Sequence, residues 1–424
     1  MERLNQIKNH FASQSASSTL KEKLKDDVVI VAAYRTAMTK GGKGHFKDFN
    51  SDELLYKLLQ QLFIKTPIDK SIIEDVIVGN VLNQGAGVNE HRAAVIAAGI
   101  PSSVPFMAVN RQCSSGLMAI NDVANKIAAG QISCGLACGV ESMSNNYGPQ
   151  AAPKISKAVS DVCSDAKNCV LPMGTTSENL NEMYGIKRGE QDQFAAKSYQ
   201  KAYHASNSGL FSDEILPIDV SIEIENDNDD EDDDDSASQP TFKSVRVSKD
   251  EGPRANVTAE SLAKLKPAFK KDGASHAGNS SQISDGAAAV LLMNRQLAES
   301  ISLPILAKYI MTTIVGVPPH IMGVGPAYAI PKLLEMCGLT VEDISVFEVN
   351  EAFAGQALFS SRSAGIPESK VNPRGGAIAL GHPLGCTGAR QVCTILRELE
   401  VGEFGVTSMC IGGGQGAAGL FVKE

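Results

Sequence analysis

The chain has 424 residues, 43% of them hydrophobic, so it is long enough to bury the cores of two or three domains. No apolar stretch reaches the length that crosses a bilayer, so we expect no membrane span. The net charge of −9 comes from one acidic tract, residues 223–235, and the remainder is close to neutral. A basic nucleic-acid surface is therefore excluded.

Nine cysteines are scattered along the chain in an odd number, which favours a reducing compartment. Cys134 and Cys138 are spaced C-x₃-C, and Cys163 and Cys169 are spaced C-x₅-C. Neither pair has a second Cys or His pair where a zinc site needs one, so we predict no metal.

Residues 1–27 are polar and show no strand pattern. Arg3-Leu4, five residues and then His10-Phe11 resemble a type 2 peroxisomal targeting signal on an amphipathic helix. The alternatives are an ordinary frayed terminus and a mitochondrial presequence, and the acidic second residue and scarce arginines weaken the latter. Residues 12–25 are expected to hold this helix clear of the folded body.

From residue 28 onward, short apolar runs alternate with helical patterns, which indicates a parallel-rich, layered α/β fold. Strands are expected at 28–33, 76–81, 104–109, 134–140, 287–293, 346–349 and 405–409, and helices at 51–63, 91–98, 117–127, 191–206 and from Pro383 to 395. Residues 145–273 break this rhythm and predict a domain-sized insertion. Its acidic tract, 223–235, is expected to be disordered because it cannot bury apolar area.

The chain also contains an internal repeat. The segment Ile73–Val78 is echoed at Val341–Val346, 268 residues later, and Val109-Asn110-Arg111 is echoed from Val371, 262 residues later. Two similar α/β halves are therefore predicted, with the insertion in the first. Paired halves place their strand ends around one shared crevice, where ligands of α/β sheets bind.

Cys113 stands where an apolar run turns into a buried helix, with the small residues Ser114, Ser115 and Gly116 after it. A helix N-terminus carries partial positive charge and free N–H groups, both of which favour the nucleophilic thiolate. The alternative is an inert buried cysteine.

Three further polar groups fall at strand ends or in glycine-rich loops, where catalytic groups tend to lie. They are Asn350 after the strand at 346–349, His382 after a small-residue loop, and Cys410 at the end of the strand at 405–409. A lone His or Asn is usually structural, but such groups at equivalent ends of repeated units point to one site.

Four motifs make the sequence resemble the thiolase family, closest to its peroxisomal 3-ketoacyl-CoA branch: Asn110–Gly116, Asn350–Phe353, Gly381-His382-Pro383 and Cys410–Gly414. The resemblance implies two similar βαβαβαββ halves in a layered αβαβα arrangement with an inserted loop domain. We divide the chain into an N-terminal targeting segment, a first half, the insertion and a second half, at 1–27, 28–144 plus 274–296, 145–273 and 297–424.

By this resemblance Cys113 attacks the 3-keto carbon and carries the acyl group, and His382 accepts its proton. Cys410 protonates the leaving enolate and then deprotonates the incoming CoA thiol. The backbone N–H groups of Cys113 and Gly412 form one oxyanion hole, and His382 with a water held by Asn350 forms the other.

Substrate contacts also follow from the resemblance: Met173, Ser281 and Phe353 are expected to line the pantetheine tunnel of CoA. Two positions depart from the common family pattern, since Pro172 stands where His is frequent and His276 where Thr is frequent.

The resemblance implies an acyltransferase of fatty acid β-oxidation that cleaves 3-ketoacyl-CoA in the peroxisome, with coenzyme A as co-substrate and no resident cofactor. It further implies a homodimer and an import receptor for the type 2 signal as partners. The dimer strand is expected at 134–140. The alternatives are a biosynthetic acetoacetyl-CoA thiolase and an inactive acyl-CoA-binding or lipid-binding protein on the same scaffold. A β-ketoacyl synthase would lack Cys410 in its C-x-G setting.

Overall fold

The computed structural model describes residues 16–224 and 241–424, and its core is one mixed sheet. The strand order is β10-β11-β12-β9-β1-β8-β5-β3-β4, with the two-residue β2 (Thr39–Lys40) beside β8. These strands are β1 (Val28–Arg35), β3 (Asp75–Gly79), β4 (Phe106–Val109), β5 (Cys134–Ser142), β8 (Ser284–Asn294), β9 (Ala307–Gly316), β10 (Ile344–Val349), β11 (Phe404–Ile411) and β12 (Gln415–Lys423).

The predicted repeat is visible in this strand order. The first half runs β4-β3-β5-β8-β1 and the second runs β10-β11-β12-β9, so β3, β5, β8 and β1 correspond to β10, β11, β12 and β9. The counterpart of β4 is a single parallel bridge between Phe347 and Val371. The halves join where β1 pairs with β9 at only two positions, Val29 with Lys308 and Ile30 with Ala307.

The expectation of a mainly parallel sheet was wrong. Apart from isolated bridges, parallel pairing in the described part of the sheet occurs between β3 and β4, β3 and β5, and β10 and β11. The two long strands β8 and β12 each run antiparallel to both of their main neighbours. Each half therefore contains a parallel βαβ portion followed by an antiparallel return, and apolar runs alone do not distinguish the two.

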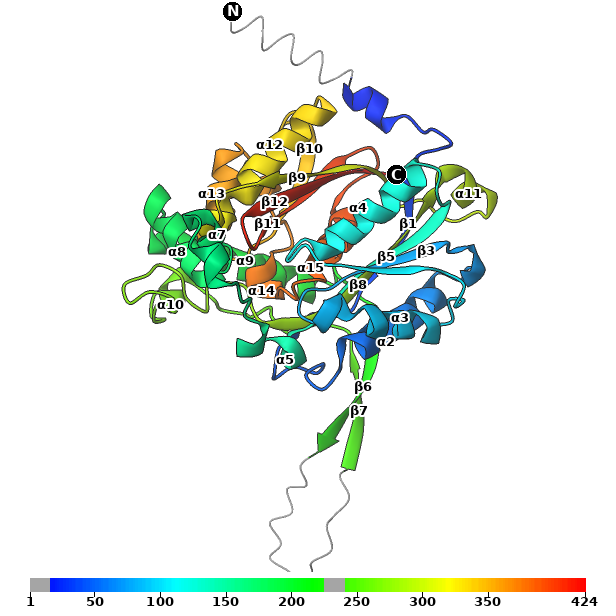
Figure 1. The fold of residues 1–424 in the computed structure, drawn as a ribbon. Helices are drawn as coiled ribbons and strands as arrows, with labels where there is room; N and C mark the ends of the chain where they lie inside the picture. The colour runs from blue at the N-terminus through cyan, green and yellow to red at the C-terminus, as the bar shows by residue number, and fades with distance from the viewer. Residues whose placement is uncertain (1–15, 225–240) are drawn as a thin grey trace, which may run out of the picture.

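Helices cover the sheet in layers (Figure 1). Helices α4 (Ser115–Ala128) and α15 (Thr387–Glu398) pack against each other between the two halves, while α2 (Ser51–Lys65) and α12 (Gly325–Cys337) cover the outer faces. Nearly every residue of α15 is buried, as expected for a helix enclosed on all sides. It begins at Thr387, and the predicted start at Pro383 was four residues early.

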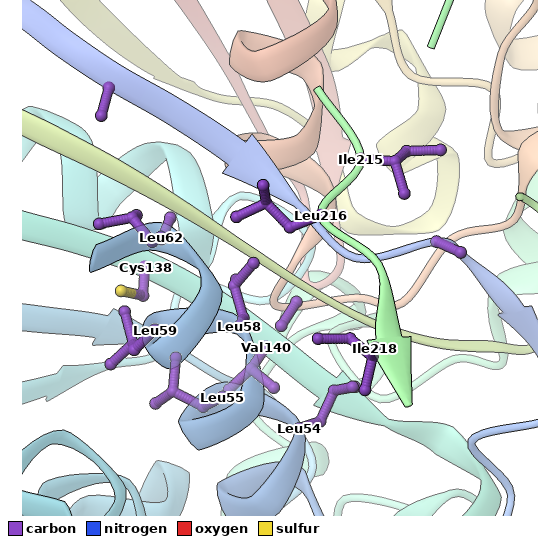
Figure 2. Packing of buried hydrophobic residues seen from close by; sticks show 14 of the residues in the cluster. Leu54, Leu55, Leu58, Leu59, Leu62, Cys138, Val140, Ile215, Leu216 and Ile218 are labelled. Atoms are coloured by element: carbon purple, nitrogen blue, oxygen red, sulfur yellow. The ribbon is translucent and has the colours of Figure 1, made fainter. Parts of the chain in front are cut away.

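The outer core of the first half is a leucine-rich contact (Figure 2). Leu54, Leu55, Leu58, Leu59 and Leu62 recur on one face of α2 and are fully buried. They belong to one cluster with Cys138 and Val140 of β5 and with Ile215, Leu216 and Ile218 of the inserted region. Burying a leucine contributes about 2 kcal/mol, so this face fixes the insertion against the sheet.

The insertion contains several helices and a two-stranded hairpin that extends from the body (Figure 1). The hairpin is made of β6 (Ile218–Ile224) and β7 (Thr241–Val247). The sequence did not predict these strands. The acidic tract begins inside β6, and its residues from 225 on lie outside the described residues. The remaining helices are α3 (Val88–Ala97), α5 (Met143–Asn146), α6 (Lys157–Ser160), α7 (Ser164–Asn168), α8 (Met173–Tyr184), α9 (Arg188–Asn207), α10 (Ala259–Leu262), α11 (Arg295–Ser300), α13 (Ala354–Ser363) and α14 (Ala377–Leu380).

An expectation about the sheet edges was also wrong. Residues 16–27 pack on the body, since Leu20 contacts the outer core of the second half and Asp27 pairs with Arg295. The separation of the helix at 3–11 from the body stays a prediction. The predicted signal at 3–11 lies outside the described residues. Strand β5 is no edge, because β3 and β8 flank it, and the edge strand of the first half is β4. Among the described helices, none has the length and apolarity to cross a membrane.

Candidate active site

A tight turn between β4 and α4 presents Cys113. Gln112 has a φ of 50°, a left-handed conformation that a residue other than glycine rarely adopts. Hydrogen bonds hold it there: the Gln112 N–H donates to Asn110 Oδ1 at 2.9 Å, and the Ser115 hydroxyl donates to the Gln112 carbonyl at 2.7 Å. The strained turn places Cys113 at the N-terminus of helix α4.

Glycines let the backbone segments around this turn approach closely. A Cβ on Gly79 of β3 would lie 2.4 Å from the Ser115 carbonyl carbon. A Cβ on Gly116 would lie 2.7 Å from the carbonyl oxygen of Gly385, in the loop that leads into α15. Cys113 therefore lies beside the contact between the two halves.

The Cys113 thiol lies beside the loop after β11. It is half-buried, and burial raises its pKa to about 11, although a hydrogen bond from the Gly412 N–H opposes that shift. Cys410, at the end of β11, is fully buried, and its pKa is raised by burial and then by the neighbouring Cys113. Both cysteines are therefore protonated thiols at neutral pH until a base acts.

His382 and Asn350 form a second group. His382 Nδ1 lies 2.6 Å from Thr387 Oγ1, and that hydroxyl donates to the Pro383 carbonyl at 3.0 Å. A hydroxyl has one hydrogen, so we assign the ring hydrogen to Nδ1, which donates to Thr387. The opposite nitrogen, Nε2, is then unprotonated and accepts a hydrogen bond from Asn350 Nδ2 at 3.3 Å.

Burial lowers the pKa of His382 to about 3, and the charge of Arg390 adds to that shift. The ring is therefore neutral at physiological pH and can accept a proton. Asn350 follows β10, where its N–H donates to the Ser408 carbonyl at 2.8 Å. Its side-chain Oδ1 is buried and makes no hydrogen bond with the described residues. A neutral base and a buried acceptor thus lie side by side in the second half.

The predicted substrate residues Met173 and Phe353 belong to one small apolar cluster with Cys410, Met322 and Ala352. Ser281 lies beside this cluster, because its N–H donates to the Ala352 carbonyl at 3.0 Å. The structure thus brings all eight sequence-predicted site residues to one region where the two halves and the insertion meet.

His276, to which the sequence assigned no role, stabilises the loop that carries Ser281. Its Nε2 lies 2.7 Å from Asp192 Oδ1, and its Nδ1 accepts from the Gly278 N–H at 3.0 Å. Asn279 donates to the same Asp192 oxygen at 3.0 Å. This buried network fixes the loop against α9.

Sequence reasoning missed Thr387, which sets the protonation of the His382 ring. The available signal was its position in the first turn of the helix that follows His382. Sequence reasoning also missed Glu141, a fully buried carboxylate at the end of β5. The only feature of the sequence that could have pointed to Glu141 is its place as an acidic residue directly after the apolar strand expected at 134–140.

Comparison with known proteins identifies the family. Residues 28–296 match the thiolase N-terminal domain, and residues 303–423 match the thiolase C-terminal domain. The chain belongs to the thiolase family. The two matches meet between β8 and β9 along the chain, at the connection from the first half to the second.

Several members of the family match over the whole chain. The peroxisomal 3-ketoacyl-CoA thiolase of Yarrowia lipolytica is 57% identical over 100% of both chains. The human peroxisomal 3-ketoacyl-CoA thiolase is 48% identical over 93% of this chain and 90% of its own. The crystal structure of the dimeric peroxisomal thiolase of Saccharomyces cerevisiae is 55% identical, with a TM-score of 0.88, covering 96% of this chain and 100% of that one.

Proposed function

We propose that the protein is a 3-ketoacyl-CoA thiolase of fatty acid β-oxidation, which uses CoA to cleave 3-ketoacyl-CoA into acetyl-CoA and a shortened acyl-CoA. Full-length identity of 57% to a peroxisomal enzyme of that activity supports the reaction. The observation that carries the mechanism is the link that Asn350 makes between the two groups. Its Nδ2 lies 3.3 Å from His382 Nε2, and its N–H donates to the Ser408 carbonyl, two residues before Cys410, which neighbours Cys113.

In the first half-reaction, the Cys113 sulfur attacks the 3-keto carbon and its proton passes to His382 Nε2, whose lone pair Thr387 keeps available. The bond between C2 and C3 then breaks. The acyl group stays on Cys113, and the electron pair leaves as the enolate of acetyl-CoA. Cys410 gives this enolate its proton, and acetyl-CoA departs.

In the second half-reaction, the Cys410 thiolate takes the proton of the incoming CoA thiol. The CoA sulfur attacks the acyl carbon on Cys113, and the bond between that carbon and the Cys113 sulfur breaks. The shortened acyl-CoA leaves, and the Cys113 thiolate takes back the proton that His382 had accepted. The N–H groups of Cys113 and Gly412 stabilise the oxyanion of the acyl group, and His382 with a water held by Asn350 Oδ1 stabilises the thioester enolate.

Coenzyme A acts as a co-substrate, and the mechanism needs no resident cofactor. Met173 and Phe353 supply apolar walls for pantetheine, and Ser281 supplies a polar contact beside them. Among the described residues, no group of three or more His, Cys, Asp or Glu side chains is placed to hold a metal ion.

The test is thiolysis of purified protein with CoA and 3-ketoacyl-CoA substrates of four and sixteen carbons. Cleavage of both substrates, with release of acetyl-CoA, is the expected result. Cleavage of the four-carbon substrate alone would favour a biosynthetic acetoacetyl-CoA thiolase. Binding of acyl-CoA without cleavage of either substrate would identify an inactive binding protein.

The protein acts in the peroxisome, in agreement with the names of its relatives. We propose that an import receptor reads Arg3-Leu4 and His10-Phe11 as one face of a helix. A reporter fused to residues 1–27 should reach peroxisomes, and the same fusion with Arg3→Glu and His10→Glu should not. A mitochondrial or cytosolic signal from the intact segment would contradict the proposal.

The protein is further proposed to form a homodimer, as the dimeric yeast relative does. Strand β4 supports this, because no strand among the described residues pairs with its outer edge and its apolar side chains, such as Phe106 and Met107, are only half-buried. Light scattering at micromolar concentration should give twice the chain mass. A monomeric mass would refute the dimer.

A further inference from the structure

Glu141 is a buried carboxylate that bonds to both halves of the molecule, and the mechanism above does not use it. Its Oε1 accepts from Asn80 Nδ2 and from the Leu82 N–H, each at 3.1 Å. Its Oε2 accepts from the Val81 N–H at 3.0 Å and from the Gly385 N–H at 2.9 Å. Three of these donors follow strand β3 of the first half, whereas Gly385 belongs to the second.

The set of donors fits only an ionised carboxylate. All four partners are N–H groups, which cannot accept a hydrogen bond, so a protonated carboxyl would leave its O–H facing donors. No cation is among these partners, and the side chain is fully buried. Burial raises the pKa of Glu141 to about 7 against the effect of its hydrogen bonds. A buried, unpaired charge costs free energy, so its retention calls for a reason beyond stability.

The position of Gly385 supplies that reason. It lies in the loop between His382 and Thr387, the residue that fixes the protonation of the His382 ring. Gly385 enters a narrow space, since an added Cβ would lie 2.7 Å from the Asn80 Cα and 2.9 Å from the Val140 carbonyl oxygen. The bond from Glu141 therefore fixes the loop of the base to the strand ends of the half that carries Cys113.

We propose that Glu141 is a positioning residue, which holds the His382 loop against the first half and so sets where the base stands relative to Cys113. Glu141 touches neither substrate nor reacting atoms and acts through the Gly385 N–H. This inference rests on the proposed thiolase reaction.

The test is a double-mutant cycle between Glu141→Gln and His382→Ala, read by the kcat of thiolysis. A glutamine keeps the shape, but its NH₂ group faces two of the four donors. In the wild-type background Glu141→Gln should lower kcat about tenfold, the effect of losing hydrogen bonds to a charged group, with KM changed less than about threefold. In the His382→Ala background it should lower kcat less than about twofold, because the base it positions is gone.

Glu214→Gln is the matched control. Glu214 is also fully buried, and it accepts from Arg35 and Thr394, away from the His382 loop. It should lower the melting temperature and leave kcat within about twofold of wild type. Equal loss of kcat in both backgrounds, or an equal loss in Glu214→Gln, would reduce Glu141 to a structural role and overturn the inference.

A milder variant carries the test if Glu141→Gln does not fold. Asn80→Ala removes one of the four donors and should lower kcat about threefold, again only where His382 is present. An unchanged kcat in that variant would also overturn the inference. A wild-type chain without thiolysis would instead refute the proposed function, so the two failures are distinguishable.

Discussion

The two halves repeat one topology but contribute unequally to the candidate active site. The first half supplies Cys113, two residues before α4 begins, whereas the second supplies His382, five residues before the equivalent helix α15. The shorter spacing leaves the thiol at the helix N-terminus, and the longer one lets Thr387 in the first helical turn reach back to the imidazole. A duplicated fold thus offers two equivalent helix N-termini. The length of the loop before each helix decides which chemical group is placed there.

The largest effect is expected from the first half. Cys113→Ala should lower the rate of thiolysis at least roughly 10³-fold, because no other group can carry the acyl intermediate. Cys138→Ala is the control, since Cys138 is a buried thiol of β5 outside the site cluster. Peptide mass analysis after incubation with 3-ketoacyl-CoA should find the acyl group on Cys113. Acylation of a different cysteine would overturn the assignment of Cys113, and with it the first half, as the source of the nucleophile.

A smaller effect is expected from the second half. His382→Ala and Cys410→Ser should each lower kcat roughly 10²-fold or more, as expected for a lost general acid–base group. The serine variant keeps the shape, but its hydroxyl is too weak an acid to exchange protons with an enolate or a thiol. Rates should be measured in both directions of the reaction. Near-normal turnover in either variant would remove that residue from the mechanism.

The sequence sufficed to place the four candidate groups at the ends of their elements, because each placement is local to its own element. Cys113, Asn350, His382 and Cys410 all follow an apolar strand or a glycine-rich loop, and periodicity locates those ends. What remained hidden depends on contacts between distant segments. The bond from Glu141 to Gly385 spans 244 residues, and the docking of residues 16–27 depends on partners near both ends of the second half.

Strand direction was hidden for a related reason. Runs such as 287–293 are apolar on both faces whether their neighbours run parallel or antiparallel, because burial and not direction selects the side chains. Strand β6 was missed because its outer part carries charges that resemble the acidic tract beyond it. Helix α15 was placed four residues early because Pro383 fits a first helical turn as well as it fits the preceding loop.

Substitutions of Thr387 test the comparison between the N-termini of α4 and α15, because the loop before α15 lets Thr387 bond to His382. Thr387→Val should lower kcat about fivefold without changing KM, since one hydrogen bond of about 1 kcal/mol holds the ring and its Nδ1 hydrogen. Thr387→Ser keeps the hydroxyl and should retain most of the activity. If the valine and serine variants lose kcat equally, the methyl packing of Thr387 and not its hydroxyl would matter.

The smallest effect is expected where the insertion leaves the body. Deleting residues 225–235 should leave turnover unchanged and alter the free energy of unfolding by less than about 0.5 kcal/mol, because a run of charges buries little apolar area. The base of the same hairpin is the contrast: Ile218 is buried in the core of the first half, and Ile218→Ala should cost about 2–5 kcal/mol. Thermal melting of the two variants beside wild type measures both effects. A deletion that lowers the melting temperature as far as Ile218→Ala does would contradict this expectation. It would show that the acidic tract is bound to the folded body, as the base of the hairpin is.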